Sequence, residues 1–223
     1  MPFPILYSFR RCPYAMRARF GLLLGQCQVE VREITLKAKP IEMLAISPKG
    51  TVPVLQLPNG DVIAESLDIM RWALTKTNSP AARQLLGETA SEQALIAELI
   101  AQNDLEFKPW LDKYKYADRH PEYSQADYFT KASVFLERLE TNLSQHPYLI
   151  GQALSLADFA IMPFIRQCNA VDAKRDLSVD FPLLMTWLAM LTSSEIFLQA
   201  MEKYVIWQAD NPPIYLLGKS ISE

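Results

Sequence analysis

Residues 5–17 read ILYSFRRCPYAMR, and this stretch decides the fold of the first part of the chain. Its apolar start predicts a short strand over 5–9, and apolar residues recurring at helical spacing after Pro13 predict a helix that ends at Gly25. Cys12 therefore lies at the N-cap of that helix, with Pro13 at the first helical position, where a missing N–H costs nothing. The sequence thus predicts a cysteine at the junction between a strand and a helix.

The rest of the first domain alternates between strand-like and helix-like segments. Asn59-Gly60 predicts a tight hairpin turn, since this pair tolerates the positive φ that such turns require, and Ser66 is predicted to cap the helix that follows. Strands joined through a helix are parallel, and strands joined by a hairpin are antiparallel. The order β-α-β-α-β-β-α therefore predicts a mixed four-stranded sheet with helices on its faces, the thioredoxin-like arrangement. The predicted elements are strands at 5–9, 29–34, 52–57 and 62–64 and helices at 13–25, 40–46 and 66–76.

The fold class predicted for the whole chain is an α/β domain, residues 1–78, followed by an all-α helical bundle, residues 88–223, with a linker at 79–87. Ser155 marks the clearest helix start of the second part, because it can cap the backbone while Asp158 reaches back to it. The last twenty residues contain two adjacent prolines, which exclude a continuous helix, and we expect a tail laid across the bundle. The predicted helices are about 88–117, 124–145, 155–172, 181–191 and 194–204.

Composition excludes several classes of protein. No apolar run approaches the ~18–20 residues that cross a bilayer, and the start lacks the basic and apolar segments of a secretory signal. The net charge of −3 argues against nucleic acid as a partner. Residues 1–80 carry a charge of +4 and residues 81–223 a charge of −7. The basic part would suit an anion, although drift of surface charge explains the difference equally well.

Three cysteines, Cys12, Cys27 and Cys168, are an odd number at no regular spacing. They predict neither a disulfide framework nor a zinc site, and with two histidines in the chain no metal centre is expected. The reducing cytoplasm is the simplest location. Cys27 and Cys168 lie in apolar contexts and are read as small buried hydrophobes.

Cys12 has the surroundings of a reactive cysteine. Unpaired N–H groups and the helix dipole point at its sulfur and two arginines precede it, so we expect a pKa below that of a free thiol. Position 15, where a dithiol enzyme has its second cysteine, is Ala15. Any disulfide of Cys12 must therefore form with a small thiol or another protein and be released by a second small thiol.

Cys12-Pro13-Tyr14-Ala15 in such a domain, followed by an all-α domain, resembles the cytosolic glutathione transferase superfamily, in particular its cysteine-type, omega-like branch. The resemblance covers nearly the whole chain and is strongest over residues 5–75. Omega-type members carry Cys-Pro-Phe-Ala here, so Tyr14 is a departure. The resemblance implies an enzyme with glutathione as cosubstrate and no metal, in the form of a cytoplasmic homodimer.

The resemblance also implies a set of glutathione contacts. Lys39 matches the residue that holds the glycine carboxylate. Val52 matches the residue before a cis-proline, Pro53, whose backbone pairs with the cysteinyl backbone of glutathione. Glu65 and Ser66 match the pair that binds the γ-glutamyl end, and physically Glu65 can accept from the ammonium while Ser66 and the helix start suit the carboxylate.

The second-substrate pocket of the family is built from the helical domain, where the match is weak. Tyr14, Tyr114, Tyr116 and Phe164 are its candidate lining residues, and a plain core or surface role is equally open for the last three. Tyr7 lies where other transferase classes carry a thiolate-stabilising tyrosine, but with Cys12 present we expect it to pack or support.

Three functions remain open at this point. The leading one is a glutathione-dependent thiol transferase or reductase, in which Cys12 forms a mixed disulfide during deglutathionylation, dehydroascorbate reduction or reduction of S-glutathionyl adducts. The second is conjugation of glutathione to an electrophile, for which a hydroxyl suits the site better than a thiol. The third is a regulatory or binding protein without catalysis, since a fold does not fix a function.

Overall fold

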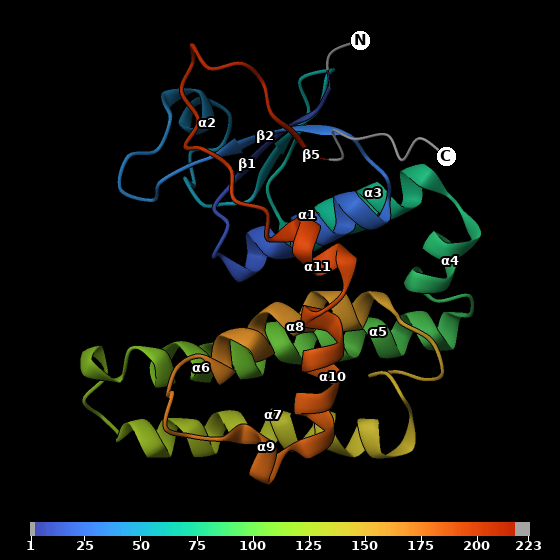
Figure 1. The fold of residues 1–223 in the computed structure, drawn as a ribbon, viewed down its shortest axis with the longest axis vertical. Coiled ribbons are helices and arrows are strands. Elements are labelled where there is room, and N and C mark those ends of the chain that lie inside the picture. Colours follow the sequence, from blue (N-terminus) through green and yellow to red (C-terminus); the bar gives the residue numbers. More distant parts are fainter. Residues whose placement is uncertain (1–2, 217–223) are drawn as a thin grey trace. The chain divides into compact units, whose positions relative to one another are not determined.

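The computed structural model describes residues 3–216. The chain forms two compact units (Figure 1). The first unit combines the residues up to Arg83 with a C-terminal segment that starts at Glu195, and the second unit comprises Gln84–Ser194. The second unit is therefore inserted, in sequence, between two parts of the first.

The first unit contains a mixed sheet with the strand order β4-β3-β1-β2-β5. β1 runs parallel to β2, with Ile5 opposite Glu30, and the other neighbours are antiparallel. Parallel pairing of β1 and β2 follows from the helix that joins them, which confirms the predicted thioredoxin-like arrangement. The strands are β1 (Ile5–Ser8), β2 (Val29–Glu33), β3 (Val54–Gln56), β4 (Val62–Ile63) and β5 (Tyr215–Leu216).

Three helices, α1 (Pro13–Leu24), α2 (Ile41–Ile46) and α3 (Ser66–Thr77), follow the predicted order. The approach of α1 to α3 is close because Gly21 has no side chain. A Cβ added there would lie 2.4 Å from the Cα of Met70, so any larger residue would push the helices apart. This close packing fixes α1 against α3.

The C-terminal segment differs from the prediction. Residues 195–216 belong with the sheet of the first unit rather than with an all-α domain of residues 88–223, and they are not a tail across the bundle. After α11 (Glu195–Ala200), β5 pairs with β2, and the N–H of Val31 donates to the carbonyl of Ile214 at 2.8 Å. The physical reason is that the outer edge of β2 carries unpaired backbone groups, which this segment satisfies.

The second unit is helical, and its predicted helices are present with shifted ends. One difference is at the predicted linker, which is mostly α4 (Pro80–Leu86). The predicted helix 88–117 is a run of α5 (Ala90–Gln102), the π-helical turn η1 (Asn103–Phe107) and α6 (Lys108–Lys115). The other predicted helices of this unit are α7 (Gln125–Gln145), α8 (Leu156–Asn169) and α10 (Pro182–Thr192). Two short helices, η2 (Ala117–Arg119) and α9 (Leu177–Asp180), were not predicted as separate elements.

Within residues 3–216, no helix combines the length and the apolar character that crossing a membrane requires.

The buried carboxylate of Asp158 joins three segments of the second unit by hydrogen bonds. Its side chain is fully buried and accepts from the N–H of Ser155 at 2.8 Å, the hydroxyl of Ser155 at 2.9 Å and the N–H of Leu149 at 3.1 Å. The indole N–H of Trp187 donates to it at 2.9 Å. The predicted start of α8 at Ser155 is thus present, and the carboxylate also connects two other segments to it.

Candidate functional site

Cys12 is the N-cap of α1, as predicted, with extended backbone angles and Pro13 in the first turn. A turn closed by the N–H of Cys12 and the carbonyl of Phe9, 2.9 Å apart, leads from β1 into the helix. The carbonyl of Cys12 accepts from the N–H of Met16 at 2.9 Å and so begins the helical hydrogen bonds. The half-buried thiol therefore lies where helix N–H groups and the dipole favour an anion.

The Cys12 thiol lies beside the cis-proline segment. Its Sγ is 3.8 Å from the carbonyl oxygen of Val52, and the bond between Val52 and Pro53 is cis. Val52 belongs to an apolar cluster that includes Tyr7 and Ala15, and Cys12 packs against this cluster. The structure thus brings together two segments that are forty residues apart in the sequence.

Lys39 extends over the start of this segment. Gly50 has a φ of +62°, and a Cβ added to it would lie 3.5 Å from the Nζ of Lys39. The exposed Lys39 ammonium is therefore next to the backbone that leads through Thr51 into Val52. Lys37, two residues earlier, is also exposed.

Glu65 and Ser66 open α3, but their roles at the helix start differ from the prediction. Glu65 is the N-cap and Ser66 is the first helical residue, with 4% of its surface exposed. The carboxylate of Glu65 pairs with Lys49 at 2.7 Å, and both side chains are largely exposed. Sequence reasoning missed Lys49, because nothing in the local pattern connects it with Glu65, sixteen residues later.

The candidates for the second-substrate pocket fall into different settings. Tyr14 is half-buried on α1, with the Arg17 guanidinium 5.7 Å from its ring centre. Tyr116 ends α6 and is flanked by charged side chains. Tyr114 is 3% exposed and Phe164 is fully buried, so both are core positions of the second unit. Their burial favours the packing role that the sequence left open for them.

The hydroxyl of Tyr7 is hydrogen-bonded to Arg32. Its hydroxyl accepts from the Nη1 of Arg32 at 2.8 Å, its side chain is 1% exposed, and burial raises its pKa. These contacts agree with the expected packing role.

The other two cysteines are buried, with 8% of Cys27 and 2% of Cys168 exposed. Burial raises the pKa of both thiols, that of Cys168 to about 12. None of the three cysteines is in a disulfide. Among residues 3–216, no group of three or more His, Cys, Asp or Glu side chains is arranged to hold a metal ion.

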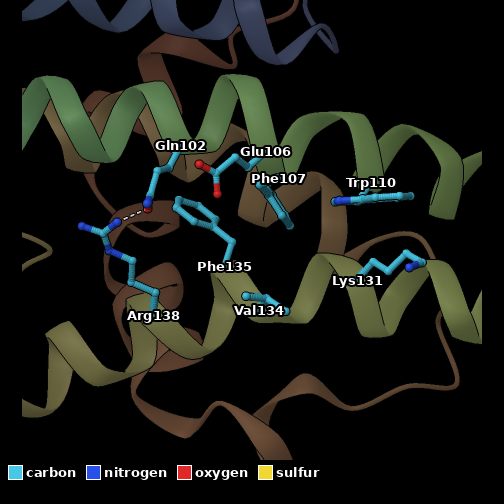
Figure 2. A pocket seen from close by; sticks show the side chains of 8 residues that line it. All are labelled: Gln102, Glu106, Phe107, Trp110, Lys131, Val134, Phe135 and Arg138. Carbon is cyan, nitrogen blue, oxygen red and sulfur yellow. Dashed lines mark hydrogen bonds between the residues drawn. The ribbon is translucent and has the colours of Figure 1, made fainter.

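A cavity of about 370 Å³ lies in the second unit between the α5–α6 run and α7 (Figure 2). Aromatic rings, among them Phe107 and Trp110, form its walls, and the guanidinium of Arg138 bonds to Gln102 at one end. The ammonium of Lys131 lies 5.0 Å from the centre of the Trp110 ring. The cavity shares no residue with the predicted site.

Comparison with known proteins gives the family. Residues 6–81 match the family model described as "Glutathione S-transferase, N-terminal domain", and residues 103–195 match "Glutathione S-transferase, C-terminal domain". The chain belongs to the glutathione S-transferase family. This confirms, at the level of the superfamily, the resemblance based on the Cys12 segment.

The individual relatives have a low sequence identity to this chain. Glutathione S-transferase omega-1 of the pig, Sus scrofa, is 25% identical over 191 residues, which are 83% of this chain and 75% of the relative. Glutathione transferase Omega 3C of Trametes versicolor has a TM-score of 0.77 at 19% identity and covers 92% of this chain and 91% of its own. A glutathione S-transferase of Methylobacillus flagellatus KT, solved with GSH bound, has a TM-score of 0.77 at 20% identity, over 88% of this chain and 98% of its own. The fold is therefore that of glutathione transferases.

Proposed function

We propose that this chain is an omega-type, glutathione-dependent thiol transferase that works through a mixed disulfide between Cys12 and glutathione. The observation that carries the proposal is the position of Cys12 at the start of α1, with its sulfur 3.8 Å from the carbonyl of Val52. Because residue 15 is Ala15, the disulfide cannot be resolved within this turn. Glutathione is the thiol that this fold family uses, and it fits the role of the resolving thiol.

The proposed reaction has two exchange steps. The Cys12 thiolate attacks the glutathionyl sulfur of a mixed disulfide, the S–S bond breaks, and the departing thiolate takes up a proton. The thiolate of a second glutathione then attacks the glutathionyl sulfur on Cys12, which forms oxidised glutathione and returns Cys12 to the thiolate. In the net reaction, the mixed disulfide and one free glutathione become the substrate thiol and oxidised glutathione. The two electrons that reduce the substrate disulfide come from the two glutathione molecules that end as oxidised glutathione, one of which arrived as the glutathionyl group.

Three side chains, a backbone segment and the N–H groups of one helix start are proposed to hold glutathione. Lys39 pairs with the glycine carboxylate, and Val52, before Pro53, pairs its backbone with the cysteinyl residue. Glu65 accepts from the γ-glutamyl ammonium, which then shares the carboxylate with Lys49 or displaces it. Ser66 and the free N–H groups of α3 receive the γ-glutamyl carboxylate. The GSH bound to the Methylobacillus transferase supports glutathione as the ligand of this fold.

The disulfide substrates proposed for this site are glutathionylated proteins. Dehydroascorbate would instead take two electrons and two protons from Cys12 and one glutathione, which join in the same mixed disulfide. From a small S-glutathionyl adduct Cys12 would take the glutathionyl group, and the bonding electron pair would leave with the substrate carbon, which takes up a proton; a second glutathione resolves the disulfide in each case. Tyr14 and Tyr116 stay proposed contacts of the second substrate. The three cysteines outside disulfides support a cytoplasmic location, and the homodimer is carried over from the family resemblance. Thiol transfer is preferred to conjugation because Cys12 stands where a conjugating enzyme places a hydroxyl, and because the Tyr7 hydroxyl is bonded to Arg32.

The test compares two activities in the wild type and in Cys12→Ser. The wild type is expected to reduce the mixed disulfide of glutathione and 2-mercaptoethanol faster than it conjugates an aromatic halide. Cys12→Ser should lose the first activity and gain some of the second, because a hydroxyl can donate to bound thiolate without forming a disulfide. A wild type that conjugates briskly and transfers no thiol would refute the proposal in favour of conjugation.

A further inference from the structure

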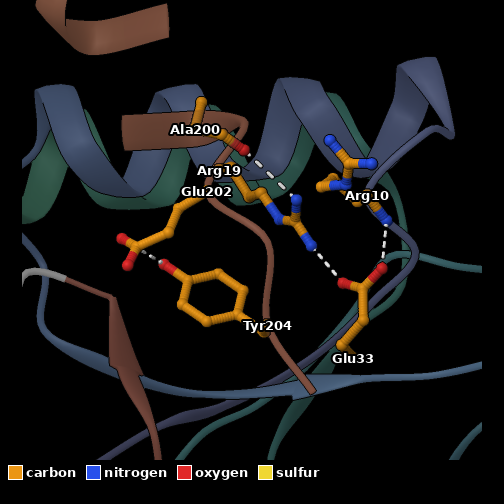
Figure 3. A network of polar contacts seen from close by, with 6 residues as sticks. All are labelled: Arg10, Arg19, Glu33, Ala200, Glu202 and Tyr204. Carbon is orange, nitrogen blue, oxygen red and sulfur yellow. Dashed lines mark hydrogen bonds and ion pairs between the residues drawn. The ribbon is translucent and has the colours of Figure 1, made fainter. Parts of the chain in front are cut away.

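A buried ion pair, drawn in Figure 3, contacts the turn that leads from β1 into α1. It joins Glu33, the last residue of β2, to Arg19 in the middle of α1. The Arg19 side chain is fully buried and Glu33 is 5% exposed. An ion pair that is withdrawn from water contributes little net stability against apolar residues of similar size, so its presence calls for another role.

The second oxygen of the Glu33 carboxylate contacts the Cys12 turn itself. Its Oε1 accepts from the backbone N–H of Arg10 at 2.6 Å, and Oε2 accepts from Arg19. Arg10 is the residue after Phe9 in the turn that ends at Cys12. One carboxylate thus ties the backbone of the turn to a side chain on the helix that the turn begins.

The C-terminal segment contacts the Arg19 side chain and the backbone of Glu33. The carbonyl of Ala200 accepts from Arg19 at 3.1 Å, and the Tyr204 ring centre lies 5.7 Å from the Arg19 guanidinium. The backbone carbonyl of Glu33 accepts from the N–H of Trp207 at 2.8 Å. Figure 3 shows Arg19 reaching from α1 towards Glu33, with Ala200 and Tyr204 of this segment near it. The charges are buried and therefore shielded from water.

We propose that Glu33 is a positioning residue for Cys12, which holds the turn before α1 so that the thiolate stays aligned with the start of the helix. Arg19 and the C-terminal segment orient Glu33 in turn. This inference rests on the proposed function only in taking Cys12 as the working residue.

The test shortens the Glu33 side chain while keeping its charge. In Glu33→Asp the carboxylate is too short to reach both partners, and the ion pair with Arg19 is the stronger contact, so the N–H of Arg10 is released. Glu30→Asp is the matched control: Glu30 lies on the same strand and pairs with Arg32 at 2.6 Å, and its carboxylate makes no contact with the turn.

The readout is the pH profile of Cys12 alkylation by iodoacetamide, which requires neither glutathione nor a second substrate. For Glu33→Asp we expect the alkylation pKa to rise, and at any pH below that pKa the rate should fall by up to about tenfold for each unit of the rise, because the thiolate fraction there falls in that proportion. The kcat for thiol transfer should fall in step, while the KM for glutathione changes by less than about twofold. Glu30→Asp should match the wild type in all three measurements.

A Glu33→Asp protein that is folded and has the wild-type pH profile would overturn the inference, as would an equal shift in Glu30→Asp. A wild type without thiol transfer whose alkylation profile still shifts in Glu33→Asp would remove the proposed function and leave the positioning role. If Glu33→Asp does not fold, amide hydrogen exchange of the wild type decides. The Arg10 amide should exchange far more slowly than the Arg11 amide beside it, and equal exchange would refute the role.

Discussion

Treatment with oxidised glutathione should modify Cys12 and leave Cys27 and Cys168 unmodified. The physical reason is the thiolate population, since only the thiolate attacks a disulfide. With a pKa of about 12, Cys168 is ionised at pH 7.4 in about one molecule in 40,000. A thiol with the ordinary pKa of ~8.5 is ionised to about 7% at that pH.

Ionisation alone therefore favours Cys12 over Cys168 by about 3,000-fold, and the greater intrinsic nucleophilicity of a thiolate of high pKa offsets only part of this ratio. Access adds to it, because the Cys168 side chain is 2% exposed and Cys12 is half-buried at a helix start. Cys27 is disfavoured on both grounds, with a raised pKa and 8% exposure. A thiol titration should also place the Cys12 pKa below that of a free cysteine.

Intact-mass analysis measures the outcome directly. The wild type should gain one glutathionyl group, Cys12→Ser should gain none, and Cys27→Ser should behave as the wild type. Peptide mapping locates the adduct. An adduct that persists in Cys12→Ser, or that maps to Cys168, would show that the ionisation argument and the assignment of Cys12 are both wrong.

Three further predictions concern glutathione affinity and stability. By calorimetry, Lys39→Ala should weaken glutathione binding by about tenfold to hundredfold, because it removes one charge-assisted hydrogen bond. The control Lys37→Ala should bind glutathione as the wild type does. The reverse result would mean that Lys39 is not the residue that holds the glycine carboxylate. Glu65→Ala should weaken binding by a similar factor, while Lys49→Ala changes it by less than about fivefold because an exposed ion pair contributes about 0–1 kcal/mol. Urea unfolding of Asp158→Ala should show a loss of about 3 kcal/mol or more, since the change leaves buried donors without their acceptor, and a loss below about 1 kcal/mol would contradict the role of this carboxylate.

The features that could be predicted from the sequence are those with a local cause. Pro13 after a strand fixes the N-cap of α1, Asn59-Gly60 fixes a hairpin, and Ser155 with Asp158 fixes the start of α8. Each depends on residues within a few positions of one another, and the helices are long enough for their period to be read. The fold class and the position of Cys12 followed from these signals.

The features that could not be predicted depend on contacts between distant parts of the chain. β5 has two residues, too few to show an alternation, and its partner β2 lies near the other end of the chain. The pairs of Glu33 with Arg19 and of Glu65 with Lys49 join residues on different elements, so no local pattern reveals them. The pair of Glu33 with Arg19 depends on how the sheet, α1 and the C-terminal segment pack against one another, which the sequence does not show.

The insertion of the second unit within the first has a consequence for the order of events during synthesis. A ribosome that adds about 5–20 residues per second needs on the order of ten seconds to pass from Arg83 to Glu195. Throughout that delay the edge of β2 that β5 later covers is open, and Arg19 lacks the Ala200 carbonyl. The helical unit, which is continuous in sequence, can finish folding before the first unit, whose synthesis began earlier. A nascent chain stalled in this interval would expose a bare sheet edge, and its Cys12 would be made but not yet held in place.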